Sequence, residues 1–249
     1  MRLRLFGQRS ARLVIADRTG IVFLLMALLA SWWGREASAE EPRPPQAVQA
    51  LWERAGARLR FVDRSEWPRP FDGWTDYRID VKYKFVSRWE GSGKRWRLSG
   101  KITEWEVQRT ALVLMPTSYQ VGDPWATPLA RHELDHLRVI AHPRIDALLD
   151  RLREDLPVIR LDSPPDEATA EPAIREQIEA RIHAVVKLVG QMGEELDRQT
   201  EHGVRPLFEE WLDQLYSEAD LKRFEFPYLE EVRSLVRTQA YRNLKLEES

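Results

Sequence analysis

His132 and His136, with Glu133 directly after the first, are the residues whose types and spacing best fit chemistry, in the stretch RHELDH. On a helix, residues four apart return to nearly the same face, so both imidazoles can reach one ion. Glu133 is rotated by about 100° from His132, too far to be an easy ligand but near enough to reach a water on the metal. In H-E-x-x-H hydrolases two neutral imidazoles hold Zn²⁺ and the glutamate takes a proton from that water. The stretch therefore predicts a Zn²⁺ site with Glu133 as general base.

Such a site needs a third protein ligand, and two further histidines are candidates. His142 has the spacing of the third ligand in H-E-x-x-H-x-x-G-x-x-H, but that motif depends on a glycine that turns the chain sharply. Val139 occupies the position of the glycine, and a β-branched residue resists the positive φ of such a turn. If the helix continues, His142 lies about 600° beyond His136 and cannot meet the same ion. His202, near the end of a long helical stretch, can be brought to the site by tertiary packing.

Each histidine also has a plain structural interpretation. A helix rich in His, Glu, Asp and Arg is commonly a solvated face. His142 can simply be held extended before Pro143. His202 can lie near the negative end of a helix dipole, where a histidine is favourable.

Strand patterns precede the histidine pair. The stretch DYRIDVKYKFVSRW, which begins at Asp76, alternates apolar and polar residues with period two, and GSGK at 91–94 predicts a turn. The pattern resumes from residue 95 to TALVLMP at 110–116, so we expect a small, mostly antiparallel sheet of three to five strands. TALVLMP is either an edge strand that holds an extended substrate by strand addition or a strand packed in the core.

Helical periodicity follows from about residue 127, with a break expected near Pro143 and a proline-rich acidic loop at 157–172. A long amphipathic helix is predicted over 173–202, ended by Gly203, and two more helical stretches over 206–217 and 219–245. The predicted fold class is α+β, a small sheet followed by a zincin-like active-site helix and a helical C-terminal half. We expect one domain over 58–249, with the sheet in 58–126 and the helices in 127–249, preceded by a leader and short helix over 40–57.

The L-x-x-H-E-x-x-H stretch, followed downstream by Asp197, Thr200, His202 and Gly203 as D-x-x-T-x-H-G, resembles a family of bacterial secreted proteins described as predicted Zn-dependent proteases, domain of unknown function 922 (DUF922). The order of tryptophan-rich strands, LVLMP, Trp125 and the histidine helix is also similar. Leu196 departs from the tyrosine that the family shows there, and the connection between LMP and the helix is short. The resemblance covers roughly residues 58–203 and implies a zinc peptidase.

The resemblance favours His202 over His142, as the turn geometry does, so the expected metal ligands are His132, His136 and His202. Asp197 and Glu201 are candidates to accept a hydrogen bond from a ligating imidazole, and Thr200 is a candidate to cap or brace the chain end near His202. Each is alternatively an ordinary residue of a helix end. A transition-state donor would complete the mechanism, and Tyr119, Tyr216 and Tyr228 are candidates among which spacing does not choose.

Residues 1–39 predict a signal peptide: arginines precede the apolar run IVFLLMALLASWW, and ASA at 37–39 offers a cleavage site. An uncleaved anchor is the alternative, although thirteen apolar residues are short for a span. We expect an exported protein, periplasmic or extracellular, without stable membrane insertion after cleavage. The 38 basic and 40 acidic residues leave no basic footprint for nucleic acid, and the absence of cysteine excludes disulfides.

The predicted function is a secreted or periplasmic zinc metallohydrolase, a peptidase acting on a peptide or protein substrate. Glu133 takes the proton of the attacking water and passes it to the leaving amine. The alternative is a non-catalytic envelope protein with a structural metal site or a partner-binding helical region.

Overall fold

The computed structural model describes residues 4–5, 9–11, 43–63, 65, 73–120 and 122–246. The signal peptide predicted for residues 1–39 lies outside the described residues, apart from the backbone of two short strands within it. The strands are β1 (Arg4–Leu5), β2 (Arg9–Ala11), β3 (Ala57–Val62), β4 (Trp74–Ser92), β5 (Arg95–Pro116) and β6 (Ile159–Leu161). The α-helices are α2 (Gln46–Ala55), α3 (Pro128–Ile140), α4 (Pro143–Glu154), α5 (Glu167–Thr200), α6 (Glu209–Gln214), α7 (Glu218–Arg223), α8 (Leu229–Val236) and α9 (Gln239–Arg242), and two 3₁₀ turns are η2 (Thr117–Gln120) and η3 (Pro124–Ala126).

A long antiparallel ribbon of β4 and β5 forms the centre of the sheet. The two strands pair from Trp74 opposite Leu114 to Ser92 opposite Arg95, with one irregularity in register after Lys84. The alternation seen in the sequence decides which side is covered, because the apolar residues of one face of β4 are buried: Ile79, Val81, Tyr83 and Phe85. The strand pattern and the turn at 91–94 are thus confirmed.

The sheet is mixed. Its order is β1–β4–β5–β3, with β2 also paired to β4 and β6 paired to β5. Strand β3 runs parallel to β5, pairing Ala57 with Ala111 through Val62 with Pro116, while the other pairs are antiparallel. The TALVLMP stretch therefore lies between β3 and β4 and is not an edge strand, so the edge-strand interpretation of it was wrong.

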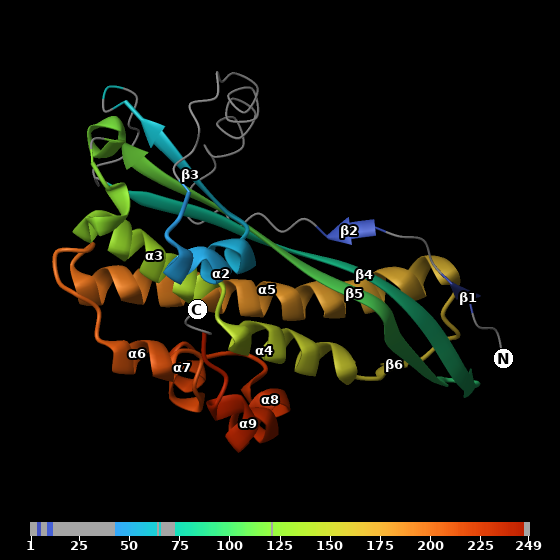
Figure 1. The fold of residues 1–249 in the computed structure, drawn as a ribbon. Coiled ribbons are helices and arrows are strands. Elements are labelled where there is room, and N and C mark those ends of the chain that lie inside the picture. Colours follow the sequence, from blue (N-terminus) through green and yellow to red (C-terminus); the bar gives the residue numbers. More distant parts are fainter. Residues whose placement is uncertain are drawn as a thin grey trace.

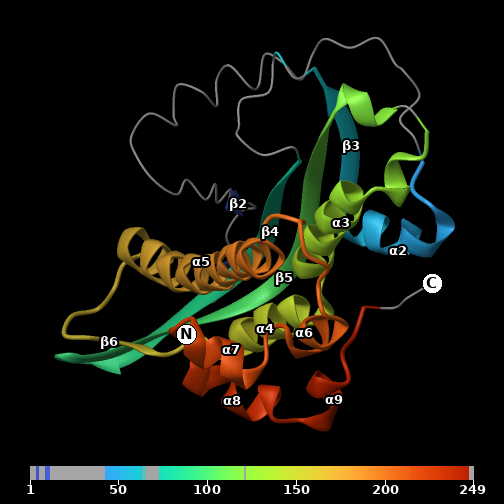
Figure 2. The same ribbon diagram turned by 90° about the vertical axis from the view of Figure 1, so that its left-hand side faces the viewer.

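Helices α3, α4 and α5 cover one face of the sheet, and the short helices α6 to α9 pack beyond them, away from the strands (Figures 1 and 2). The α+β class is confirmed. Among the described residues, no helix has both the length and the apolar composition to cross a membrane.

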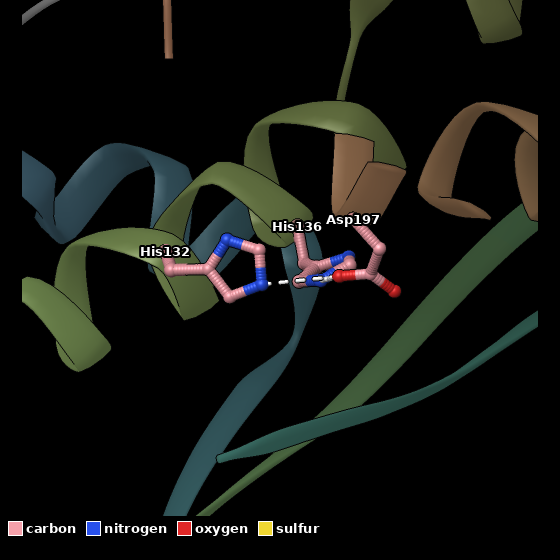
Figure 3. A group of neighbouring side chains, drawn as sticks. All are labelled: His132, His136 and Asp197. Atoms are coloured by element: carbon pink, nitrogen blue, oxygen red, sulfur yellow. Dashed lines mark hydrogen bonds and ion pairs between the residues drawn. The ribbon is translucent and has the colours of Figure 1, made fainter. Parts of the chain in front are cut away.

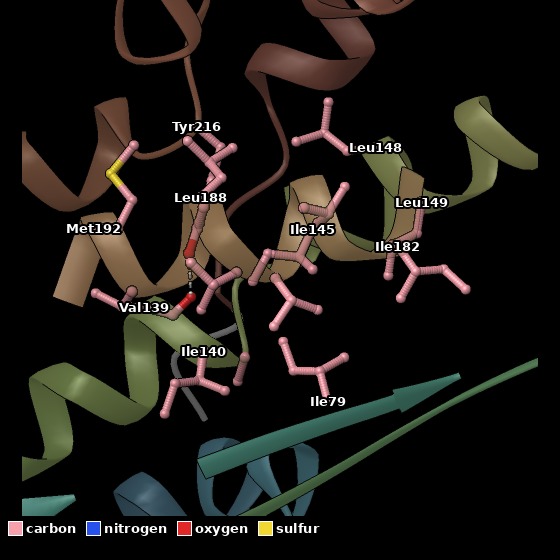
Figure 4. Close-up of a cluster of buried hydrophobic side chains, with 14 of the residues drawn as sticks. Ile79, Val139, Ile140, Ile145, Leu148, Leu149, Ile182, Leu188, Met192 and Tyr216 are labelled. Carbon is pink, nitrogen blue, oxygen red and sulfur yellow. Dashed lines mark hydrogen bonds between the residues drawn. The ribbon is translucent and has the colours of Figure 1, made fainter. Parts of the chain in front are cut away.

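The hydrophobic core lies between the ribbon and these three helices. Figure 4 shows Ile79 of β4 facing Ile140 of α3, Ile145 of α4 and Ile182 of α5, all at most 3% exposed. Burial on this scale, at roughly 1.5–3 kcal/mol for each large apolar side chain, fixes α3 and α5 beside each other. That contact sets the geometry of the candidate site.

The helix boundaries agree with the sequence prediction at the start of α4 and differ from it at the start of α5 and after residue 206. The break near Pro143 is confirmed, since α3 ends at Ile140 and α4 begins at Pro143. Helix α5 starts at Glu167 and not at 173, because Asp166 and Thr169 form a capping box at its first turn. Pro172 lies within α5. The two helical stretches expected after 206 are four short helices, and β6 lies in the region predicted as a loop.

A buried arginine attaches the C-terminal helices to α4. The Arg144 side chain is 4% exposed, and its guanidinium donates hydrogen bonds of 2.6–3.2 Å to four backbone carbonyl oxygens, those of Asp213, Leu215, Tyr241 and Arg242. The contacts to the Leu215 and Tyr241 carbonyls are buried, so these two oxygens depend on the guanidinium for a partner, while those to Asp213 and Arg242 are partly buried.

Arg144→Ala is expected to lower the free energy of unfolding by about 3–5 kcal/mol, because buried carbonyls lose a charged donor. Urea denaturation followed by far-UV circular dichroism measures this loss. The matched control is Arg151→Ala on the same helix, whose arginine pairs with the exposed Asp155, and about 1 kcal/mol or less is expected there. Equal losses in both variants would contradict the attachment role of Arg144.

Candidate metal centre

The start of α3 is fixed by a cap that sets the direction of both histidines. The Thr127 hydroxyl accepts a hydrogen bond from the Ala130 amide at 3.1 Å, and Pro128 occupies the first helical position. From this start, His132 and His136 fall on the face of α3 that packs on α5. The predicted helical setting of the pair is confirmed.

Three donor atoms converge between α3 and α5. Oδ1 of Asp197 lies 3.1 Å from Nε2 of His132 and 3.0 Å from Nε2 of His136 (Figure 3). One possible ligand atom from each of the three residues lies within 4.8 Å of the others. The exposed side-chain fractions are 6% for His132, 16% for His136 and 31% for Asp197, so the histidines are mostly covered and the carboxylate is partly exposed. This group can bind a metal ion.

The carboxylate of Asp197 is held in its charged form. Burial acts to raise its pKa, but the hydrogen bonds from His132 and His136 more than offset burial and hold the pKa well below its usual value. For His136 burial acts to lower the pKa, and the bond to Asp197 outweighs it and raises the pKa. The histidines and the carboxylate therefore favour a positive charge, a proton or a cation, between them.

Thr200 orients the ring of His132. Its single hydroxyl proton is directed to the Leu196 carbonyl at 2.9 Å, and the Gly203 amide donates to its oxygen at 3.2 Å. Nδ1 of His132, 3.3 Å from the same oxygen, is then the proton donor in that contact. With a metal ion bound between them, a neutral ring with its proton on Nδ1 would present the lone pair of Nε2 to the ion, which is the tautomer that a metal requires.

Gly203 allows this close packing. Its φ is 85°, and a Cβ at this position would lie 2.9 Å from both Cβ and Cγ of His132. Any other residue would be strained by the backbone and would push the ring. The glycine expected to end the long helix therefore also makes room for a predicted ligand.

Glu133 is buried on the sheet side of α3. Its side chain accepts a hydrogen bond at Oε2 from the Thr75 hydroxyl of β4 at 2.6 Å, and it is 3% exposed. Burial raises the pKa of Glu133 above its usual value. A Cβ at residue 73 would overlap Oε1 of Glu133 and Cδ1 of Leu129, so a larger residue there would require these side-chain ends to move. Glycine at this position leaves room for the carboxylate beside β4.

His202 lies next to the group but outside it. Its φ is 54° in a left-handed turn that follows α5, its side chain is 50% exposed, and its Nδ1 lies 3.6 Å from Oδ1 of Asp197. The structure thus places Asp197 in the ligand group, although Asp197 was expected only as an acceptor behind a ligand. Thr200, expected to brace the chain end near His202, contacts His132, while the other candidate acceptor, Glu201, pairs with Arg205 at 2.9 Å.

His142 caps the next helix and does not face the metal group. It is 2% exposed, and its Nδ1 accepts a hydrogen bond from the Arg144 amide at 3.2 Å. Its φ of −60° and ψ of 130° are those of an extended residue, which confirms the structural role before Pro143 that the sequence offers as the alternative to metal binding. Among the three tyrosine candidates, Tyr216 is fully buried and donates to the Val139 carbonyl at 2.9 Å, which makes it part of the core.

The pKa of His142 is lowered to about 3, first by burial and then by the positive charges of Arg144 and Arg54. In the unfolded chain this imidazole takes up a proton below about pH 6.5, whereas the folded chain resists protonation until about pH 3. Stability is therefore complete above pH 6.5 and falls as the pH decreases, by at most about 1.4 kcal/mol per pH unit.

His142→Asn removes this part of the pH dependence, because an amide oxygen can accept the same bond from Arg144 without taking up a proton. Urea denaturation between about pH 4 and 7, with chelator present to exclude bound metal, is expected to give a shallower slope than the wild type. His183→Asn on α5, where the histidine is exposed, is the control and keeps the wild-type slope. An unchanged slope in His142→Asn would contradict the assignment.

Two partners of Glu133 were missed by sequence reasoning. In the sequence, Thr75 is 58 residues from Glu133 and Gly73 is 60 residues from it. These residues come together only because α3 packs on β4, and a sequence pattern does not reveal such a contact. The comparisons with known proteins add nothing to these contacts: no family model, no curated protein and no solved structure matches this chain.

Proposed function

We propose that this protein is a zinc-dependent hydrolase that cleaves peptide bonds. The observation that carries the proposal is the convergence of two imidazole nitrogens and one carboxylate oxygen within 4.8 Å, beside the buried Glu133. If Asp197 only formed structural ion pairs with the two histidines, Glu133, a second carboxylate directly after His132, would have no role.

The donor set fits zinc. Zn²⁺ binds imidazole nitrogen and carboxylate oxygen, and catalytic sites combine three protein ligands with one open position. Ligands about 2.0–2.1 Å from a tetrahedral ion lie roughly 3.3 Å apart. The distances of 3.0 and 3.1 Å from Asp197 to the histidines therefore need only a small adjustment. We propose Asp197 as third ligand, with His202 as the neighbouring donor.

The chain's own residues then have separate roles. Zinc, when bound, supplies Lewis acidity that polarises a carbonyl and makes a nearby water more acidic. Glu133 accepts the proton of the attacking water and returns it to the leaving amine. Thr75 occupies Oε2 of Glu133, so the proton transfer is assigned to Oε1. Thr200 keeps the proton of His132 on Nδ1, away from the metal.

The substrate class rests on the resemblance to the predicted proteases of domain of unknown function 922. Export to the periplasm or the medium rests on the arginines, apolar run and ASA stretch of residues 1–39. A peptide or protein substrate is consistent with both.

One observation favours a second function, a non-catalytic envelope protein with a structural metal. His202 lies close enough to Asp197, 3.6 Å, that a rotation of its side chain could add a fourth ligand. Four protein ligands would leave no position for water, and the metal would then serve stability alone.

Metal removal tests the proposed function. The protein, with any leader removed by the host, is dialysed against chelator and incubated with a mixture of unstructured peptides. We expect hydrolysis only after zinc is restored, and no recovery with Mg²⁺, which prefers oxygen ligands in octahedral geometry. Mass spectrometry of the peptides identifies the cleaved bonds. Zinc binding that raises the melting temperature without any cleavage would support the second function instead.

A further inference from the structure

The far end of the β4–β5 ribbon carries a hollow of about 640 Å³ that is separate from the metal group. Ser92 lies seventeen positions along β4 from Thr75, the partner of Glu133, which is roughly 55 Å of strand. Figure 1 shows this end of the ribbon beside β6, away from α3. The charged residues that line the hollow are four cations and two acids: Lys94, Arg95, Arg97, Arg160, Glu90 and Asp162.

The cations there are only partly neutralised within the described part of the chain, since Glu90 of β4 stands opposite Arg97 in the strand register. Arg97 of β5 stands directly opposite Arg160 of β6 in the strand register. Like charges in that position disfavour strand pairing. None of the four cations forms an ion pair with a described carboxylate, and Glu90 is engaged by Arg88 at 3.4 Å. The lining therefore has an excess of positive charge that an anion would relieve.

We propose that this hollow binds an organic phosphate monoester. Two guanidinium groups side by side match the oxygens of a phosphate, each through a planar fork of donors. A monoester carries a charge near −2, which complements the net positive charge that four cations and two acids give the lining. Trp96 and Leu161, both only partly exposed, also line the hollow; they stand opposite each other one position along the ladder, so their side chains lie on the other face of the strands from those of Arg97 and Arg160. The site needs neither the metal nor the proposed hydrolase activity.

Two probes distinguish the sources of such a phosphate. Phenyl phosphate, followed by titration calorimetry, represents a soluble ester. Vesicles of phosphatidylcholine with phosphatidic acid, followed by co-sedimentation, represent a lipid headgroup. Binding of phenyl phosphate supports a soluble ligand, and binding to vesicles alone supports the headgroup.

The test variant replaces Arg97 and Arg160 by Gln. The matched control replaces Lys82 and Lys84 by Gln, which removes the same charge from the same ribbon but from residues paired with Glu106 and Glu104. We expect the arginine variant to bind the probe at least about tenfold more weakly and the control to stay within about twofold. Arg97 and Arg160 are exposed, and Lys82 and Lys84 are partly exposed. An unchanged melting temperature confirms that both double variants fold.

Three outcomes would overturn the proposal. The wild type binds neither probe, both double variants lose binding equally, or binding is lost in His136→Ala and kept in the arginine variant. The second outcome indicates diffuse attraction by net charge, and the third indicates that the phosphate binds at the metal group.

Discussion

Glu133→Gln is expected to lower the rate of peptide hydrolysis by about 10²–10⁴-fold while zinc content stays at the wild-type level. The amide has nearly the shape of the carboxylate, and its oxygen can still accept the bond from Thr75. It cannot accept the proton of the attacking water. Glu133 contributes no ligand atom to the metal group, so the substitution is expected to leave zinc binding unchanged. Steady-state rates on a cleaved peptide, beside metal analysis of the same samples, measure both quantities.

Asp135→Asn is the matched control for that experiment. Asp135 lies in the same helix between the two histidines, is largely buried with a side chain 14% exposed, and pairs with Arg138 at 3.1 Å. The substitution makes the same change of carboxylate to amide, yet its rate is expected within a few-fold of the wild type. Full activity in Glu133→Gln would reject Glu133 as the base. A loss of zinc from that variant would show that its lower rate has another cause.

Asp197→Ala is expected to weaken zinc binding by at least about 100-fold. His202→Ala is expected to weaken it by less than about tenfold. Asp197 contributes an oxygen 3.0–3.1 Å from both histidine nitrogens, and its loss leaves two ligands. His202 is half exposed, and its Nδ1 lies 3.6 Å from Oδ1 of Asp197, farther than either histidine nitrogen of the metal group. Competition with a chromophoric chelator at pH 7 gives both affinities.

Asp197→Asn and His142→Ala complete that series. The amide keeps the size of the side chain but removes the charge, so zinc affinity is expected to fall between the wild type and Asp197→Ala. His142→Ala is expected to leave affinity unchanged, because His142 caps α4. The reverse order, with His202→Ala the more severe change, would make His202 the third ligand, as the sequence resemblance implies.

The local part of the site could be predicted from the sequence. His132 and His136 share a face because the helix is regular, and the cap at Thr127 and the break at Pro143 are local signals. The position of His202 depends on where α5 ends. The sequence pattern placed that end at Gly203, but the helix ends at Thr200 and His202 lies in a left-handed turn. That turn directs His202 off the helix face, while Asp197 remains on it.

The partners of Glu133 and the order of the strands could not be predicted. Alternation shows which residues of β4 are buried, but it carries no information on which strand lies beside which. The sequence of TALVLMP is therefore compatible with an edge strand, although β3 pairs with it along Ala111 to Pro116. The bond from Thr75 to Glu133 likewise exists only because the core packs α3 against the start of β4.

Zinc K-edge X-ray absorption of the wild-type protein, together with its metal stoichiometry, tests the central claim most directly. The account predicts one zinc per chain, with nitrogen and oxygen neighbours at about 2.0–2.1 Å and the multiple scattering of two imidazoles. His132→Ala with His136→Ala is expected to remove this signal. A wild-type protein that binds no zinc, or a zinc spectrum that persists without these two histidines, would contradict the account.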